Sequence, residues 1–598
     1  MIKSTQSKHF VFNLAAGILT IALLGSCTKK EDTQYVNYVH EAIETNVKGF
    51  DPVISGDLYS GVVMAQIFEN LFQYAYLERP VKVEPLLSDG MPTVSKDGLT
   101  YTFKIRQGIH FHDDPSFKDN GGKGREIVAD DFIYSWKRLI DPKNKSDGAW
   151  IFENKVKGFN EWRDEAVKSG SADYSKPVEG FETPDKYTIK IHLLKPYPQI
   201  LYVLTMVPSA VVPKEAVDFY GPDFQNHPVG SGPYKFKSWT HGAQIVLDKN
   251  PTYHDENYPS KGEPVDEANG LLADAGKKLP LNDGVIFYEV VETQPRWLNF
   301  RKGNYDWIKI PKDNFDNAVK SDQLVDDFKN QGVMLTKWIE PDTTFDSFNM
   351  DDPVVGGKNK YLRQAMSLAV NTTELIKTFY NGRAIPAQGP IPPDISGYDP
   401  HLKNPYRTYD LEKAKDLLKK AGYPDGKGLP EIVYETYSGS DIRQILEYLQ
   451  QEEAKIGVKI KINMNTWPEF LEKTRARKAQ MLGMAWSADY PDGENYLQLF
   501  YGPNSSPGPN NSNYNNPVYN KLYEEAAVLQ DGPQRNKIYK QMVDILIEDA
   551  PWIFDVHRKA YVLSHGWFKN YKRNLILLNY IKYYRIDQEA KAALKKKL

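Results

Sequence analysis

The side chains with the clearest potential for metal chemistry are His-Phe-His-Asp-Asp at residues 110–114. Imidazoles at positions i and i+2 project to one side of a strand, and carboxylates follow them, so this string has ligands that a metal ion could use. Such strings are weak evidence without a fixed ligand spacing, and a glycine-rich loop follows at residues 120–124. We therefore interpret the string as the polar end of a strand, and we predict no metal site and no cofactor.

The common catalytic motifs are absent from the sequence. It contains no G-x-S-x-G elbow, no G-x-x-x-x-G-K-[ST] loop, no H-E-x-x-H pair and no C-x-x-C pair. These motifs supply the nucleophiles, phosphate-binding loops and metal ligands of many hydrolases, nucleotide-binding proteins and metalloenzymes. We predict that the chain is not an enzyme, and a secreted hydrolase is the alternative from a different class of protein.

The only cysteine, Cys27, follows an apolar segment near the N-terminus. The first residues are basic, the chain is then mostly apolar up to Leu24, and small residues precede the cysteine, as in a secretory signal peptide. Leu-Gly-Ser-Cys at residues 24–27 resembles the lipobox of bacterial lipoproteins, whose cysteine thiol is diacylated. A buried thiol and a membrane anchor are the alternatives, but the apolar run is shorter than the roughly 18 to 20 residues that a span needs. We predict a signal peptide at residues 1–26, lipidation of Cys27 and a linker at residues 27–32.

Composition constrains how the rest of the chain is stabilised. With no second cysteine, no intramolecular disulfide can form, so packing must hold the fold together. A chain of 598 residues exceeds one hydrophobic core and should divide into lobes. A net charge of −3 gives no indication of nucleic-acid binding. The 38 Tyr, 26 Phe and 11 Trp residues supply rigid amphipathic rings suited to lining clefts.

Periodicity predicts a mixture of strands and helices. Apolar and polar residues alternate with period two over residues 101–106 and 187–193, which predicts half-buried strands. Residues 129–140 have a helical pattern that ends before Asp-Pro. A second helix begins at Asp410, carries an apolar stripe, and ends where Gly422 can terminate it.

One stretch has the pattern of a βαβ unit. Residues 431–437 and 458–464 are predicted strands, and residues 441–456 are the helix between them. A right-handed crossover makes the two strands parallel. Ligand sites in open α/β sheets lie beyond the carboxyl ends of strands, so the residues just after Met464, beginning with Trp467, are candidate ligand contacts.

Several strings, taken together and in order, resemble a known family. The chain is similar to the bacterial family 5 extracellular solute-binding proteins, the group that includes the oligopeptide-binding and dipeptide-binding proteins of ABC importers. Each string alone is weak evidence, whereas their order along the chain is specific. The matching strings occupy residues 51–52, 67–71, 101–108, 129–132, 229–234, 362–371, 410–422 and 485–492.

The resemblance implies an α/β fold: a two-lobed periplasmic-binding-protein clamp of type II, like those of cluster C, with an extra inserted domain. The two chain crossings between the lobes, near residues 343–345 and 556–559, would form the hinge. The implied division is a first lobe of residues 33–60, 178–343 and 558–598, an inserted domain of residues 61–177, and a second lobe of residues 344–557.

The same resemblance implies a ligand site around Asp489. In oligopeptide binders the matching aspartate pairs with the free α-amino group of the peptide, and a buried ammonium does need such a charge partner. Without the family match, Asp489 would be interpreted as an Asx-turn residue. Trp467 and Trp486 match the tryptophans of the family's side-chain pockets, with core packing as the alternative. Ala485 and Ser487 would offer backbone groups to the ligand.

Three further residues complete the predicted ligand-binding set. Tyr490 follows Asp489 in the family's string, and Glu44 and Thr45 would face the peptide from the first lobe. The family also has an arginine shortly before the tryptophan-containing string, and this chain has Gly483 there. The resemblance therefore does not say how the carboxylate of the peptide is recognised.

The function implied by the resemblance is capture of extended oligopeptides for an ABC importer. The receptor would work in the periplasm or cell envelope, and its lipid anchor would be its contact with the membrane. An inner-membrane permease would be its partner, and we expect a monomer that binds no nucleic acid. Family members that bind nickel, haem or oligosaccharides provide the alternative ligands.

Overall fold

The computed structural model describes residues 35–54, 56–437, 440–573 and 576–598. The chain divides into two compact units, Met1–Val36 and Asn37–Leu598, and the architecture given below is that of the second unit. The predicted signal peptide at residues 1–26, Cys27 and the predicted linker at residues 27–32 all lie outside the described residues. Among the residues that are described, no helix has the length and apolar character needed to cross a membrane.

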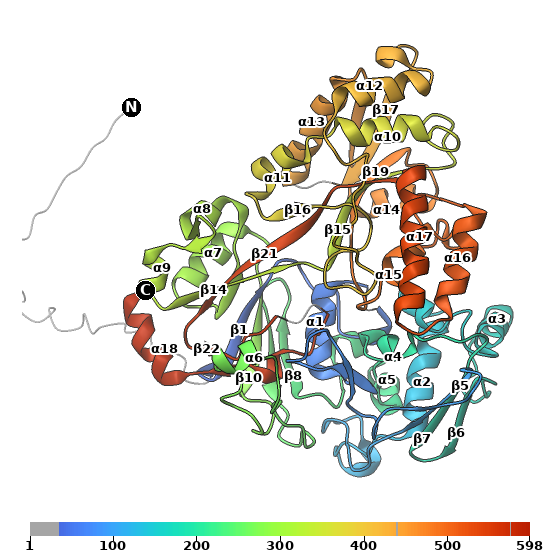
Figure 1. The fold of residues 1–598 in the computed structure, drawn as a ribbon. Helices are drawn as coiled ribbons and strands as arrows, with labels where there is room; N and C mark the ends of the chain where they lie inside the picture. Colours follow the sequence, from blue (N-terminus) through green and yellow to red (C-terminus); the bar gives the residue numbers. More distant parts are fainter. Residues whose placement is uncertain (1–34, 55, 438–439, 574–575) are drawn as a thin grey trace, which may run out of the picture. The chain divides into compact units, whose positions relative to one another are not determined.

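A four-stranded sheet forms the centre of the first lobe (Figure 1). The outer strand β1 runs parallel to β10, whereas β9 and β8 continue the sheet in antiparallel fashion. Val39, Leu247 and Phe287 are fully buried beneath it, because alternate residues of a strand face the same side. In spatial order, the strands are β1 (Tyr38–Ile43), β10 (Gly284–Glu289), β9 (Gln244–Lys249) and β8 (Tyr234–Thr240).

A second four-stranded sheet packs with helix α2 (Ala129–Ile140), as predicted for residues 129–140. The predicted strands at 101–106 and 187–193 are confirmed as its two central strands. Two of its strands therefore follow residue 177, where the predicted inserted domain ends. In spatial order, the strands are β4 (Thr93–Val94), β5 (Thr100–Lys104), β7 (Thr188–His192) and β6 (Phe181–Asp185).

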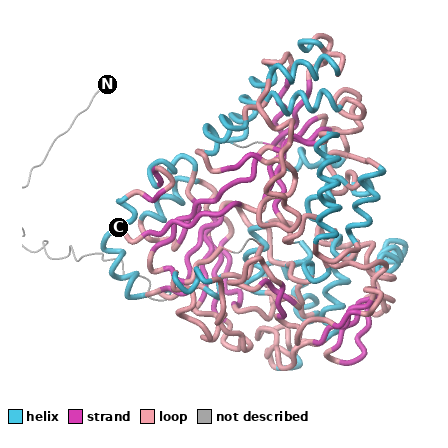
Figure 2. The backbone as a smooth tube through the Cα atoms, viewed as in Figure 1, coloured by secondary structure: helices cyan, strands magenta, loops and turns pink. Residues whose placement is uncertain are grey.

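The second lobe contains a five-stranded sheet with helices beside it (Figure 2). The predicted βαβ unit is confirmed, because β17 and β18 are parallel and α13 (Ser440–Ala454) connects them. Strand β18 lies at the edge of the sheet, which explains the lysines that alternate with its apolar residues. In spatial order, the strands are β18 (Ile460–Asn465), β17 (Ile432–Tyr437), β19 (Met481–Ser487), β15 (Asp342–Phe348) and β20 (Trp552–Phe554).

The predicted helix after Asp410 is α12 (Leu411–Lys420). The Asp410 side chain caps it by accepting a hydrogen bond from the Lys413 amide, and Leu417 and Leu418 face the core. Gly422 has a φ of +92°, a conformation that favours glycine, so the chain leaves the helix there. The second lobe also contains three other helices: α10 (Lys360–Ala369), α16 (Pro517–Ala527) and α17 (Pro533–Asp549).

Two chain passages connect the lobes, at β15 and at β21 (Val556–His565). Strand β21 pairs with β14 (Val333–Ile339) and β11 (Trp307–Lys309), and its first residues pair with β16 (Ala384–Pro386). The passages are fastened to each other, since Arg558 Nε donates to Asp342 Oδ2 at 2.7 Å and His557 Nδ1 donates to the Asp342 carbonyl at 3.0 Å. These passages coincide with the two predicted hinge segments.

Residues of several strings that resemble the family make buried structural contacts. Arg138 of α2 forms two hydrogen bonds with Asp51, at 3.0 and 2.7 Å, and both side chains are nearly inaccessible. Gly232 donates its amide to the Ile67 carbonyl. A Cβ on Gly230 would lie 2.1 Å from that carbonyl oxygen, so only glycine fits this close approach.

Replacing Arg138 with methionine should strongly destabilise the fold around α2 and Asp51. The substitution leaves the Asp51 carboxylate buried without a cation, which typically costs about 3–5 kcal/mol. Urea unfolding followed by circular dichroism measures the loss. Lys377→Met is the matched control, because its partner Glu374 is 3.6 Å away and both side chains are exposed. Equal stability of the two variants would show that the Arg138–Asp51 pair contributes no more than a surface pair.

Candidate ligand-binding site

Two cavities, each of about 460 Å³, are lined by successive parts of the segment that leads to Asp489. Cavity A is lined by Asp489, Ser487, Trp150, Tyr74 and Arg573, with residues of α1 (Leu58–Ile67). Cavity B is lined by Ala485 and Gly483 of the same strand and by residues from both lobes. The sequence-predicted residues Asp489, Ser487, Ala485 and Glu44 therefore line one cavity or the other.

Asp489 is half-buried in the wall of cavity A. Its Oδ2 accepts a hydrogen bond from Asn495 Nδ2 at 2.9 Å, and its amide donates to Asn495 Oδ1 at 3.0 Å. No cation lies within ion-pairing distance of Asp489 among the described residues. Burial raises the pKa of the Asp489 carboxyl to about 6, although the Asn495 hydrogen bond opposes this shift.

Asn495 contacts two of the predicted site residues and was not predicted from the sequence. Its Oδ1 also accepts a hydrogen bond from Trp486 Nε1 at 3.0 Å, so one amide orients both Asp489 and Trp486. The turn before this helix is closed by Asp492, whose Oδ1 accepts a hydrogen bond from the Glu494 amide at 3.0 Å. Asn495 lies in the short helix α15 (Glu494–Leu497), and nothing in its sequence spacing distinguishes it.

The strand β19 has an open edge next to both cavities. Ala488 donates its amide to Pro341, and Asn349 donates to Gln480, so the even-numbered residues of β19 face β15. The N–H and C=O groups of Ala485 and Ser487 consequently point the other way. On that side β17 pairs with Met481 and Leu482, and no described strand pairs with the remainder of β19.

The three aromatic residues predicted for the site differ in how far they are buried. Trp467 is 47% exposed and packs edge-to-face on Tyr437, which lines cavity B. Trp486 is half-buried. Tyr490 is buried, stacked on Tyr202 with ring centroids 5.8 Å apart. Trp467, Trp486 and Tyr490 contribute to the walls of neither cavity.

Of the two first-lobe residues predicted to face the ligand, one lines a cavity and the other does not. Glu44 lines cavity B, where its carboxylate is 3.6 Å from the Arg296 guanidinium. Thr45 is half-buried and lines neither cavity. Only Glu44 of this pair is positioned to contact a molecule in cavity B.

Tyr434 explains why position 483 is glycine in this chain. A Cβ at Gly483 would lie 2.0 Å from the Tyr434 hydroxyl, which donates a hydrogen bond to the buried Asp346 carboxylate. The tyrosine–aspartate pair thus occupies the space that a side chain at position 483 would need. A cation cannot reach the cavity from this position.

Ion pairs connect residues that line the two cavities. Glu340, in the wall of cavity A, lies 2.9 Å from Lys309 of cavity B and 2.8 Å from Arg573 of cavity A. Burial would raise the pKa of Glu340, but Lys309 and Arg573 lower it to about 2. The glutamate therefore remains ionised, and two cations share its single negative charge.

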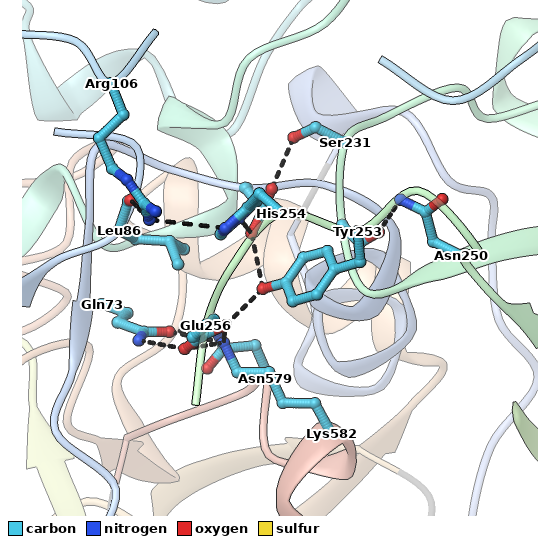
Figure 3. Close-up of polar contacts among 12 residues, drawn as sticks. Gln73, Leu86, Arg106, Ser231, Asn250, Tyr253, His254, Glu256, Asn579 and Lys582 are labelled. Atoms are coloured by element: carbon cyan, nitrogen blue, oxygen red, sulfur yellow. Dashed lines mark hydrogen bonds and ion pairs between the residues drawn. The ribbon is translucent and has the colours of Figure 1, made fainter. Parts of the chain in front are cut away.

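A buried polar network, drawn in Figure 3, includes residues that line cavity A. The Tyr253 hydroxyl lies between Glu69 and Glu256, at 3.0 and 2.5 Å. Lys582, which is fully buried, neutralises Glu256 at 2.7 Å and also donates to Gln73. Since Glu69 and Gln73 line the cavity, this network fixes two of its polar groups in place.

The histidine-aspartate string at residues 110–114 makes structural contacts. His112 is buried, and its Nε2 donates to the Gly232 carbonyl at 2.9 Å. Burial lowers the pKa of His112 to about 4, so the ring is neutral at physiological pH. Asp113 pairs with Lys123 at 2.8 Å. In the part of the chain that the structure describes, no group of three or more metal-ligating side chains is assembled.

Comparison with known proteins identifies the family. Residues 82–508 match the model of the bacterial extracellular solute-binding proteins, family 5 middle region. The chain belongs to this family. Its members are substrate-binding proteins of the type that serves ABC importers, and the fold is their two-lobed α/β architecture.

Two curated relatives and one solved structure show the extent of the similarity. The glutathione-binding protein GsiB of Salmonella typhimurium is 26% identical over 520 residues, covering 86% of this chain and 87% of the relative. Di/tripeptide-binding protein 2 of Pseudomonas aeruginosa is 26% identical over 530 residues, covering 86% and 90%. The structure of the periplasmic binding protein DppA from Helicobacter pylori, in complex with the peptide STSA, matches with a TM-score of 0.72 and 26% identity, covering 92% and 98%.

Replacing Asp489 with asparagine should stabilise the ligand-free protein at alkaline pH. A carboxyl whose pKa is raised on folding binds more protons in the folded state, so it costs stability above that pKa and has no effect well below the unfolded value. We expect a gain of about 1 kcal/mol at pH 8, discounted for partial exposure, and almost none at pH 3.5. Thermal unfolding at both pH values measures the difference.

The exposed Asp416→Asn on α12 serves as the control. It should leave stability unchanged at both pH values, because its carboxylate is solvated. A loss of stability for Asp489→Asn that is equal at both pH values would mean that Asp489 has a structural role.

Proposed function

We propose that this protein captures peptides for an ABC importer and binds their free α-ammonium group at Asp489. The observation that carries the proposal is a half-buried carboxylate in a cavity wall, with an amide donor and no ion-pair partner among the described residues. A carboxylate in that position is poorly solvated, and a ligand ammonium would restore the missing charge partner.

The open edge of β19 would bind the peptide backbone. An extended peptide can add to a free strand edge through main-chain hydrogen bonds, which tolerate varied side chains. The outward-facing groups of Ala485 and Ser487 lie between the two cavities and are suited to that pairing. A ligand with its amine at Asp489 would then extend along β19 towards cavity B.

The relatives support a peptide ligand. The similar proteins are described as binding glutathione and di- or tripeptides, and the DppA structure contains the peptide STSA. Nickel, haem and oligosaccharide remain the alternative ligands within the family. None of them carries a primary ammonium group to pair with Asp489, so the experiment below separates them from peptides.

The remaining parts of the proposal concern organisation and location. We propose that Cys27 carries a lipid that holds a monomeric receptor at a membrane of the cell envelope, near its permease partner. The first lobe, the inserted domain and the second lobe would have the predicted boundaries, and β15 and β21 would act as the hinge. A tethered receptor meets its permease at a raised effective concentration.

Asp489→Asn should weaken binding of peptides that have a free amine. Loss of a charge-assisted hydrogen bond is typically worth about 1.5–3 kcal/mol, which predicts a roughly 10- to 100-fold higher Kd for the tripeptide Ala-Ala-Phe. Isothermal titration calorimetry measures it. N-acetylated Ala-Ala-Phe is the matched ligand, and it should bind both proteins equally weakly.

The pH dependence provides a second readout of the same contact. An ammonium partner lowers the pKa of Asp489 in the complex, so binding releases a proton and affinity falls as the pH drops through about 6. Asp489→Asn should remove this dependence. Tight binding of acetylated and free peptides alike, with no change in the variant, would refute the assignment of the amine to Asp489.

A further inference from the structure

A third cavity, cavity C, has a volume of about 420 Å³. Among the described residues, none that lines cavity C also lines cavity A or cavity B. Its walls are the segment that follows β16 and one face of α17, and it reaches His557 at the start of β21. Cavity C is therefore separate from the site proposed for the peptide.

The wall of cavity C is apolar and rigid. Four of its lining residues are prolines, whose side chains lose almost no conformational entropy when a ligand packs on them. They are Pro386, Pro390, Pro400 and Pro533. Tyr398 adds an aromatic ring to the same lining. Apolar cavities of this size that contain a few placed polar groups are typical sites for small molecules.

His557 supplies a buried polar group to cavity C. The residue is 2% exposed, and its Nδ1 lies 3.0 Å from the Asp342 carbonyl oxygen. A carbonyl can only accept, so the ring proton is on Nδ1 and Nε2 is a hydrogen-bond acceptor. No described group donates to Nε2. Burial lowers the pKa of His557 to about 4, so the ring stays neutral at physiological pH and Nε2 keeps its lone pair.

The two chain passages between the lobes fix the position of this acceptor. Thr343 Oγ1 donates a hydrogen bond to the Pro390 carbonyl at 2.8 Å, and the same oxygen lies 3.1 Å from His557 Nδ1. Thr343 belongs to β15 and His557 to β21, so both passages hold the end of cavity C at which the imidazole lies. An acceptor that is already held in place loses little freedom when a ligand binds, which favours binding.

The part of cavity C formed by α17 carries two exposed lysines, Lys537 and Lys540. Lys540 Nζ lies 3.4 Å from Asp399, which also lines the cavity, and 3.9 Å from Asp544. Lys537 has no acidic side chain within 4 Å among the described residues. Lys537 is therefore the cation that remains for an anionic group, although solvent and salt weaken a contact at an exposed lysine.

We propose that cavity C is a second binding site, which takes a small hydroxylated aromatic acid. The hydroxyl group donates to His557 Nε2, the ring packs on Tyr398 and the prolines, and the carboxylate lies at Lys537. The assignment goes beyond peptide capture and does not depend on it, because the described lining residues of cavity C are distinct from those of cavities A and B.

Titration of the unaltered full chain with three matched compounds, followed by ligand-observed NMR, tests the proposal. 4-Hydroxyphenylacetate should bind about fivefold more tightly than phenylacetate, which lacks the hydroxyl donor. It should bind about threefold more tightly than 4-hydroxyphenylacetamide, which lacks the charge. Equal affinities for the first two compounds would overturn the His557 contact, and equal affinities for the acid and the amide would overturn the Lys537 contact. Failure of all three to bind would overturn the site.

Substitutions on α17 test the location. Asn536 lines cavity C, and its Oδ1 has no hydrogen-bond partner in the described structure, so Asn536→Phe fills space without removing a contact of that oxygen. This variant should abolish the binding of 4-hydroxyphenylacetate, and unchanged binding would overturn the location. Lys537→Met should make the acid and the amide bind equally, whereas the exposed Lys419→Met should keep the preference for the acid. If Asn536→Phe does not fold, the comparison of the two lysine variants still decides.

Competition with a peptide separates cavity C from the peptide site. Saturating Ala-Ala-Phe should not displace 4-hydroxyphenylacetate, and Asp489→Asn should bind this compound as tightly as the unaltered protein does. Displacement by the peptide, or weaker binding in Asp489→Asn, would place the compound in the peptide site and overturn the cavity C assignment. If Ala-Ala-Phe does not bind while 4-hydroxyphenylacetate binds with the expected preferences, the proposed function fails and the cavity C assignment stands.

Discussion

The antiparallel pairing of β15 with β19 is the constraint on which the site depends. Its register makes the even-numbered residues of β19 bond to β15, and so turns Ala485 and Ser487 towards the open edge. A shift by one residue would reverse every one of these directions. The same strand ends next to Asp489, where the Asn495 amide holds the carboxylate in the wall of cavity A.

The charges of the cleft are arranged so that its two ends differ. Among the described residues, Asp489 of cavity A has no ion-pair partner, and Lys312, Arg383 and Lys559 of cavity B have no carboxylate within 4 Å, while Glu340 joins a cation of each cavity. A zwitterionic peptide in the proposed direction would meet the opposite charge at each end. Electrostatic complementarity of this kind selects orientation as well as ligand class.

Regular local patterns made much of the fold predictable from the sequence. Each element that was predicted carries its own periodicity or cap. These elements are the βαβ unit, α2, α12, and the strands β5 and β7 of the sheet that packs with α2. The cavities could not be predicted in the same way. The clash between Gly483 and Tyr434, the contact of Asn495 with Asp489, and the convergence of Arg383 with Lys559 join residues that no local pattern relates. Sequence resemblance likewise gave no indication that Trp486 and Tyr490 would pack away from both cavities.

The most direct test of the central claim is native mass spectrometry of the full chain purified without unfolding, followed by release and fragmentation of any ligand that remains bound. The account predicts short peptides with an unblocked amine, and a lower retained fraction in Asp489→Asn than in the unaltered protein. Retention of a sugar, a haem or a metal ion in place of peptides, at the same level in both proteins, would contradict it.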